Sequence, residues 1–120
     1  MTIDNTARTV TFDDLREANL KRADEWVPID KWSLSDRLVE LQEEVGELCG
    51  AAKRINRIRA GVYHKPTTED ELRQRMAEEL ADVLICADLV GAALGVDLSA
   101  AIVSKFNATT DKHERLTVKL

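Results

Sequence analysis

Apolar residues recur every three or four positions along most of the chain, which is the spacing of helices that bury one face. Turn-forming residues are scarce, with five glycines and two prolines in 120 residues, so few positions favour strands joined by tight turns. The pattern predicts an all-α chain. We expect four helices, over about residues 12–27, 34–60, 68–94 and 98–113, arranged as a four-helix-bundle-like protomer in a single domain spanning residues 1–120.

Residues suited to helix ends bracket these segments. Candidate N-caps precede each helix: Thr11, Ser33 or Ser35, Thr68, and Asp97 or Ser99. Thr68 and Glu71 have the spacing of a capping box. Gly61 and Gly95 follow the second and third helices, where a left-handed residue commonly ends a helix. The tail from residue 114 to 120 is expected to be loose or bound to a partner.

The third helix is apolar almost all the way round between Leu80 and Val96, and Asp82 and Asp88 are its main interruptions. A helix with one wet face would not show this pattern. We therefore expect it at the centre of a bundle or in a subunit interface, with Asp82 in or beside a dry environment. An unpaired carboxylate there needs a metal ion, a basic partner or a proton.

Two acidic runs interrupt the apolar pattern of the second and third helices. Because residues three apart share a helix face, Glu44 pairs with Glu47, and Glu79 pairs with Asp82. If the two helices pack side by side, four carboxylates converge, and like charges at about 4 Å repel by about 4 kcal/mol per pair at an effective dielectric of 20. Mg²⁺ or Mn²⁺, which prefer oxygen ligands, would convert this repulsion into binding.

Two other interpretations of the acidic residues stand beside the metal site. The run on the second helix could be a solvated acidic face. A di-iron bundle would require Glu-x-x-His pairs, and neither His64 nor His113 has that spacing. Ligation by oxygen alone favours Mg²⁺.

Composition narrows the class of partner. The net charge of −5 argues against a groove for a nucleic acid polymer, but it is compatible with a free nucleotide bridged by metal. No segment approaches the roughly 20 apolar residues of a membrane span, and residues 1–10 lack an apolar signal core. The sequence predicts a soluble, cytoplasmic protein in which Cys49 and Cys86 are reduced, buried thiols.

The acidic motifs resemble those of a known family. Glu-Glu-x-x-Glu at residues 43–47, followed by Glu-x-x-Asp at 79–82, is similar to the all-α nucleoside triphosphate pyrophosphohydrolases of the MazG type, which include dimeric dUTPases and dCTP pyrophosphatases. Weaker similarity covers residues 15–26, 32–34 and 105–112. Two departures are the long interval between the motifs and the segment 112–115.

The resemblance implies a metal site and an activity. The residues that match the family's Mg²⁺ ligands are Glu44, Glu47, Glu79 and Asp82. The implied reaction is Mg²⁺-dependent hydrolysis of a nucleoside triphosphate, with a deoxynucleotide expected, to a monophosphate and pyrophosphate; Mn²⁺ would substitute for Mg²⁺. Glu43, one residue before the metal pair, is our candidate for orienting or deprotonating the attacking water; its alternative is a solvated helix glutamate.

Substrate contacts are predicted from residue type and place. Positive charge for the leaving pyrophosphate is expected from Lys53, Arg54 and Lys105. Arg57 could serve the same purpose, or it could only complement the dipole at the C-terminal end of its helix. Trp32, or Trp26, could stack on a base or cap the core. Asn19 and Asn107 could hydrogen-bond a base or sugar, or make local contacts only.

Two rival functions remain open at this stage. A related enzyme could act on another diphosphate link, such as that of phosphoribosyl-ATP. Alternatively, the chain could be a non-catalytic helical module whose acidic face binds a basic protein. For the main hypothesis we expect a homodimer or homotetramer, because a single small bundle with such an apolar third helix leaves surface to cover.

Overall fold

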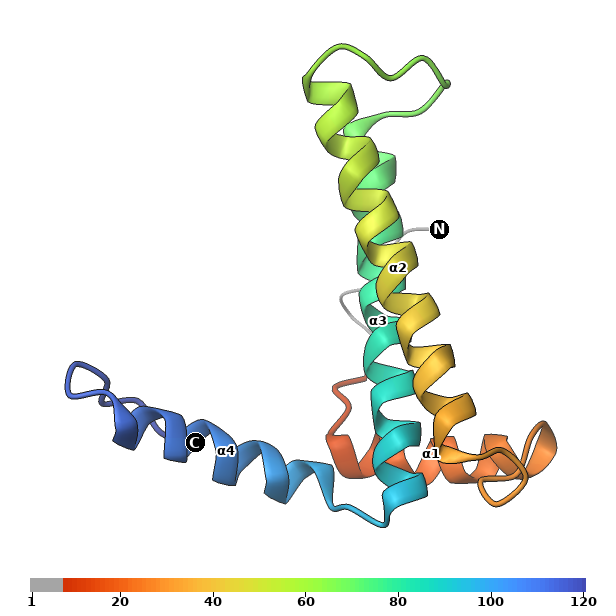
Figure 1. Cartoon of the computed structure of the whole chain (residues 1–120). Coiled ribbons are helices and arrows are strands. Elements are labelled where there is room, and N and C mark those ends of the chain that lie inside the picture. Colours follow the sequence, from red (N-terminus) through yellow and green to blue (C-terminus); the bar gives the residue numbers. More distant parts are fainter. Residues whose placement is uncertain (1–7) are drawn as a thin grey trace.

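In a computed structural model that describes residues 8–120, the chain folds into four α-helices, with no strand among these residues. Two long helices, α2 (Leu34–Arg59) and α3 (Glu69–Leu94), pack side by side as an antiparallel hairpin (Figure 1). α1 (Phe12–Glu25) lies across the end where α2 begins and α3 ends, and α4 (Leu98–Lys112) leads away from that end. The all-α prediction is confirmed, and the predicted bounds are close, although α1 ends before residue 27.

The helix ends follow the predicted chemistry. The side chains of Thr11, Ser33, Thr68 and Asp97 each accept a hydrogen bond from a backbone N–H in the first turn. The first three form capping boxes, in which the third helical residue also bonds back to the cap. Gly61 and Gly95 have φ values of 71° and 67°, a left-handed conformation that favours glycine, so both predicted helix ends are confirmed.

One chain has little core of its own. Its accessible surface is 9040 Å², whereas a compact monomer of its mass, 13.4 kDa, would expose about 6,500 Å². The radius of gyration is 17.6 Å, against about 13.6 Å for a compact domain of this length. The buried apolar side chains are few and mostly small: Ala23, Ala51, Ile55, Leu72 and Cys86.

α3 is not at the centre of the protomer. Leu80, Leu84 and Leu94 expose about half of their surface, at 50%, 48% and 56%. Asp82 is exposed, so the expectation of a dry environment for this residue is wrong within a single chain. The reason is geometric: α2 covers one side of α3, α1 reaches only one end, and α4 points away instead of closing a bundle (Figure 1).

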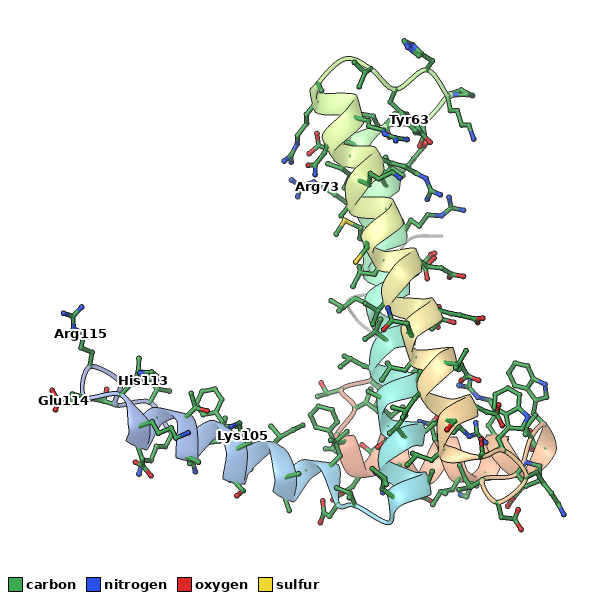
Figure 2. All side chains as sticks on the ribbon, in the orientation of Figure 1. Tyr63, Arg73, Lys105, His113, Glu114 and Arg115 are labelled. Atoms are coloured by element: carbon green, nitrogen blue, oxygen red, sulfur yellow. The ribbon has the colours of Figure 1, made fainter. Side chains whose placement is uncertain are left out.

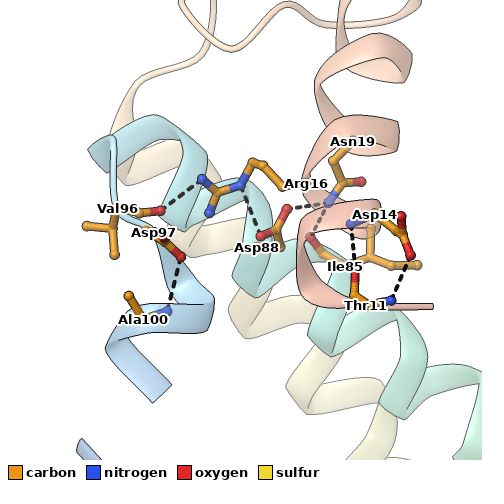
Figure 3. A network of polar contacts seen from close by, with 9 residues as sticks. All are labelled: Thr11, Asp14, Arg16, Asn19, Ile85, Asp88, Val96, Asp97 and Ala100. Carbon is orange, nitrogen blue, oxygen red and sulfur yellow. Dashed lines mark hydrogen bonds and ion pairs between the residues drawn. The ribbon is translucent and has the colours of Figure 1, made fainter. Parts of the chain in front are cut away.

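The carboxylate that α3 does bury is Asp88, which is 0% exposed. Arg16 donates from Nε to Asp88 Oδ1 at 3.1 Å, and Asn19 donates from Nδ2 to Oδ2 at 3.0 Å (Figure 3). Arg16 also donates from Nη1 to the carbonyl of Val96 at 2.8 Å, and Asn19 to that of Ile85 at 3.2 Å. This network fixes α1 across the end of the hairpin.

The tail folds back along α4 and is not loose. Thr110 donates its hydroxyl to the carbonyl of Val118 at 2.6 Å, and the backbone N–H of Leu120 donates to Asn107 Oδ1 at 2.9 Å.

Across residues 8–120, no single helix combines the length and apolar content needed to cross a membrane; α3 and α4 reach them only as a pair bent by 103°. The prediction about an N-terminal signal core rests largely on residues 1–7, which lie outside the described residues.

Candidate metal centre and adjoining cleft

Three of the four predicted metal ligands meet between α2 and α3. Carboxylate oxygens of Glu44, Glu79 and Asp82 all lie within 4.8 Å of one another. Glu44 comes from α2, while Glu79 and Asp82 share a face of α3 because they are three residues apart. The Glu47 carboxyl adjoins that of Glu79. We call Glu44, Glu47, Glu79 and Asp82 the acidic cluster.

Negative charge in this cluster is poorly compensated. Burial raises the pKa of Glu44, and the nearby carboxylate of Asp82 raises it further. Burial and the adjacent Glu47 carboxyl also raise the pKa of Glu79, while the charge of Arg75 opposes this more weakly. The Oε2 atoms of Glu44 and Glu79 are buried and have no hydrogen-bond partner among residues 8–120. Buried carboxylate oxygens without partners are costly, so this arrangement favours a bound cation.

The donor set of the acidic cluster fits a hard divalent cation. All of its candidate ligands are carboxylate oxygens, without histidine or cysteine, which is the ligand chemistry of Mg²⁺ and Mn²⁺. The two unpartnered Oε2 atoms offer lone pairs that no protein donor occupies within the described chain. The residues therefore fit the predicted metal, with Glu47 beside the three that meet.

A cleft of about 360 Å³ opens next to the acidic cluster, between α1, α2 and the second half of α3. Glu43, Glu44 and Asp82 form its acidic end. Apolar side chains line the interior: Ala23, Val27, Ile85 and Leu89. An apolar cleft with a few convergent polar groups is typical of small-molecule sites.

Glu43, the residue predicted to activate water, lies at the edge of the cleft. It borders both the cleft and a shallower neighbouring depression beside Trp32. It is exposed, so solvent reaches its carboxylate. Its place next to Glu44 on α2 puts it at the edge of the acidic cluster without joining the three converging oxygens.

Two residues of the cleft were not predicted to contact a ligand. Arg37 is 4% exposed, donates from Nη2 to the carbonyl of Val27 at 3.0 Å, and places its guanidinium carbon 4.9 Å from the centre of a Trp32 ring. Glu40 accepts a hydrogen bond from the thiol of Cys86, with Sγ 3.2 Å from Oε1. Glu40 lies one helical turn before Glu44 and Arg37 lies two turns before it, and this spacing is the sequence signal that could have identified them.

The other predicted cleft residues have mixed surroundings. Asn19 borders the cleft, but both of its amide donors are occupied by Ile85 and Asp88. Trp32 and Trp26 border it as well and are 38% and 82% exposed.

The predicted phosphate-binding cations do not all lie on one side of the molecule. Lys53 and Arg54 are on α2, beyond Glu47 in the direction of the hairpin tip. Lys105 and Asn107 are on α4, which points away from the hairpin (Figure 2). Both amide atoms of Asn107 bond to the backbone of Leu120. Within one chain, the α4 pair is not brought to the acidic cluster.

The two cysteines differ in environment. Cys86 is buried as expected, and burial, followed by the adjacent Glu40 carboxylate, raises its pKa to about 12. Cys49 is exposed, so the expectation that both thiols are buried is wrong. The flank of α2 that carries Cys49 is left uncovered in a single chain.

No protein-family model matches the chain, and a search of curated proteins finds no significantly similar sequence. The resemblance to MazG-type enzymes therefore remains an interpretation of the residue pattern. Function has to be argued from the acidic cluster and the cleft.

Proposed function

We propose that the protein is a Mg²⁺-dependent pyrophosphohydrolase that cleaves a nucleoside triphosphate, with deoxynucleotides as the expected substrates, to a monophosphate and pyrophosphate. One observation carries the proposal: three carboxylates converge, two of them with unpartnered buried oxygens, and two of the three, Glu44 and Asp82, line a cleft that also has apolar lining residues. Such a pair of features suits a ligand that has a metal-binding phosphate chain at one end and a flat, largely apolar group at the other.

The residues divide the chemistry between them. Glu44, Glu79 and Asp82, with Glu47 alongside, would hold Mg²⁺, or Mn²⁺ in its place. When bound, the ion neutralises charge on the phosphates and lowers the pKa of a water molecule bound to it. Glu43 is exposed at the edge of the cluster, so its carboxylate can accept a proton from the water that attacks the α-phosphorus. Lys53 and Arg54 are the α2 cations proposed to stabilise the departing pyrophosphate.

We also propose that the working protein is a homodimer or homotetramer. The accessible surface of one chain exceeds that of a compact monomer of the same mass by roughly 2,500 Å². This excess is larger than the area that one subunit buries in a typical protein–protein interface. The exposed face of α3 and the detached α4 both remain available to a second copy (Figure 1). Such a copy could bring its own Lys105 and Asn107 toward the acidic cluster, which a single chain does not do.

Product analysis tests the reaction directly. Purified protein is incubated with each common deoxynucleoside triphosphate and with phosphoribosyl-ATP, with Mg²⁺ or with chelator. We expect metal-dependent release of pyrophosphate and a monophosphate. Release of orthophosphate would contradict attack at the α-phosphorus, and activity confined to phosphoribosyl-ATP would favour the related enzyme.

A thermal scan separates the enzyme from a non-catalytic acidic module. A bound metal stabilises the folded state according to its concentration and affinity, so Mg²⁺ should raise the melting temperature and chelator should lower it. A melting temperature that ignores Mg²⁺, together with no hydrolysis, would support the module. The substrate pool of the proposed enzyme is cytoplasmic, and we propose that compartment for the protein.

A further inference from the structure

We propose that Glu40 and Arg37 recognise the edge of the nucleobase in the cleft, and that they select bases carrying an exocyclic amino group over uracil and thymine. The inference rests on the proposed function, because it takes the ligand to be a nucleotide. It goes beyond that function by naming the substrate class and the residues that choose it.

Glu40 offers an acceptor inside the cleft. Its Oε1 atom accepts the thiol hydrogen of Cys86, which fixes the direction of the carboxylate. Cys86 stays protonated at neutral pH, since its pKa is raised to about 12, so the thiol remains a donor. An ionised carboxylate has lone pairs on both oxygens and no hydrogen to give. The remaining acceptor capacity of Glu40 therefore matches a donor on the ligand.

Arg37 offers a donor beside it. The guanidinium is held by the carbonyl of Val27 and by stacking on Trp32, so it has little freedom to turn away. Its Nε atom is buried and has no hydrogen-bond partner within the part of the chain that the structure describes. A buried donor of this kind is costly unless a ligand atom accepts from it. Arg37 and Glu40 are three residues apart on α2 and both line the cleft.

This acceptor and donor match some bases better than others. Cytosine and adenine place an amino group next to a ring nitrogen that accepts, and guanine places adjacent N–H donors next to a carbonyl. A carboxylate accepting from the cytosine amino group and an Arg donating to guanine are pairings that recognise these two bases in nucleic acids, and adenine has the same arrangement of amino group and ring acceptor as cytosine. With the ring in the position that places the amino group of cytosine on Glu40 and its ring N3 on Arg37, uracil and thymine would place a carbonyl oxygen against the carboxylate and a ring N–H against the guanidinium.

The rest of the cleft suits a flat ring. Ile85 and Leu89 form an apolar wall, and Trp32 lies at the mouth with 38% of its surface exposed. The acidic end of the cleft determines the orientation of the nucleotide. Its phosphates would lie toward Glu44 and Asp82, and its base toward Arg37.

Binding of monophosphates in chelator tests this selection without any hydrolysis. Deoxycytidine and deoxyuridine monophosphates differ only at the amino or carbonyl edge in question. Calorimetry with the full chain should show deoxycytidine monophosphate binding at least about tenfold more tightly, which is the discrimination expected of one good base contact. Deoxyadenosine and deoxyinosine monophosphates form a second matched pair with the same expected direction.

The Glu40→Gln variant should reduce this preference at least about fivefold. Glutamine can still accept from Cys86, but it can also donate to a carbonyl oxygen. The matched control is Glu17→Gln, which removes the same charge from the exposed α1 pair with Lys21, outside the cleft. Circular dichroism checks that each variant is folded. An unchanged ratio in Glu40→Gln, or an equal fall in Glu17→Gln, would overturn the assignment.

The outcomes distinguish this inference from the proposed function. Base preference that depends on Glu40, with no pyrophosphate release from any triphosphate, would support the cleft assignment and contradict the enzyme. Pyrophosphate release with a base ranking that Glu40→Gln leaves intact would support the enzyme and overturn the cleft assignment. In a third outcome, the Glu40→Gln variant keeps the base ranking but is no longer stabilised by Mg²⁺. Glu40 would then belong to the metal site, and the cleft assignment would be overturned.

Discussion

Helix α3 carries carboxylates in two contrasting environments. Asp88 is fully buried, yet both of its oxygens are bonded, one to Arg16 and one to Asn19. Six residues earlier, Asp82 meets Glu44 and Glu79 in a group that contains only like charges. The same helix thus holds one carboxylate with a partner on each oxygen and another, Glu79, with a buried oxygen that has no partner among residues 8–120.

The difference separates a structural role from a binding role. At Asp88, the chain itself supplies the compensating cation, and the result joins α1 to α3 (Figure 3). At the acidic cluster, burial and then the neighbouring carboxylates raise the pKa of Glu44 and Glu79, which destabilises the folded state unless a cation binds. Stability alone would favour a basic residue there. The acidic cluster therefore fits the proposed Mg²⁺ site better than it fits a purely structural role.

The largest expected effect follows from neutralising the cluster. In a Glu79→Gln/Asp82→Asn double variant, hydrolysis should fall by about 10³-fold, because the residues proposed to hold Mg²⁺ lose their charge. The melting temperature in chelator should stay the same or rise, since repulsion is removed. Pyrophosphate release and thermal scans measure the two quantities.

Glu78→Gln is the matched control for that variant. It removes one negative charge next to Glu79 on the same helix, at a position outside the acidic cluster. We expect hydrolysis within about twofold of the unmodified protein, as for a change remote from the reacting groups. Equal losses in the control and the double variant would indicate a general charge effect instead of a metal site.

The next largest effect is expected at Asp88, the carboxylate that has a protein partner on each oxygen. Asp88→Ala should lower the free energy of unfolding by about 3 kcal/mol, because removing one partner of a buried pair leaves Arg16 uncompensated. Urea denaturation measures the change. Asp88→Asn, which keeps the shape and one acceptor, should cost less, and Mg²⁺ should still stabilise both variants. An Asp88→Ala protein as stable as the original would show that the network does not hold α1 in place.

A smaller effect is expected at Gly91, where the Arg16 side chain of α1 lies close to the α3 backbone. A Cβ atom at Gly91 would lie 2.7 Å from Nη2 of Arg16, which is held by its bonds to Asp88 and Val96. Gly91→Ala should therefore destabilise the protein by about 1–2 kcal/mol, as expected for overpacking, despite the better helix propensity of alanine. Gly46→Ala, where a Cβ would meet nothing within 4 Å, is the control and should be neutral or stabilising. A stable Gly91→Ala variant would mean that Arg16 shifts easily.

Local sequence signals predicted the helices well. Thr11, Thr68 and Gly95 act within one turn of their own position, so a short window of sequence was enough to place the helix ends. The convergence of Glu44 with Glu79 and Asp82 was also predictable, because helix spacing and an antiparallel hairpin determine it.

Long-range contacts were harder to predict. Asp88 and Asp82 both interrupt the same apolar run, and only the place of α1 decides that Arg16 reaches the former. The direction of α4, and hence the distance of Lys105 from the cluster, depends on the turn at Gly95. The role of Arg37 required knowing that Val27 and Trp32 lie against it.

The last prediction uses pH to compare the two environments. Both Glu44 and Glu79 have a pKa above the ordinary glutamate value of 4.5 in the folded state. The folded protein therefore binds more protons than the unfolded chain between 4.5 and the raised values, and the stability in chelator should fall as pH rises through that window.

The acidic cluster should respond differently once metal is present. Because Mg²⁺ competes with protons for the same oxygens, its stabilising effect should grow as pH rises through the same window. In a Glu44→Gln/Glu79→Gln variant, the stability in chelator should no longer fall with pH, and the stabilisation by Mg²⁺ should no longer grow with pH. The Asp88→Asn variant should retain both effects. Melting temperatures with and without Mg²⁺, measured from pH 4.5 upward, decide this. If the stability in chelator instead rises with pH, equally in the unmodified protein and in both variants, repulsion in the acidic cluster does not destabilise the folded protein.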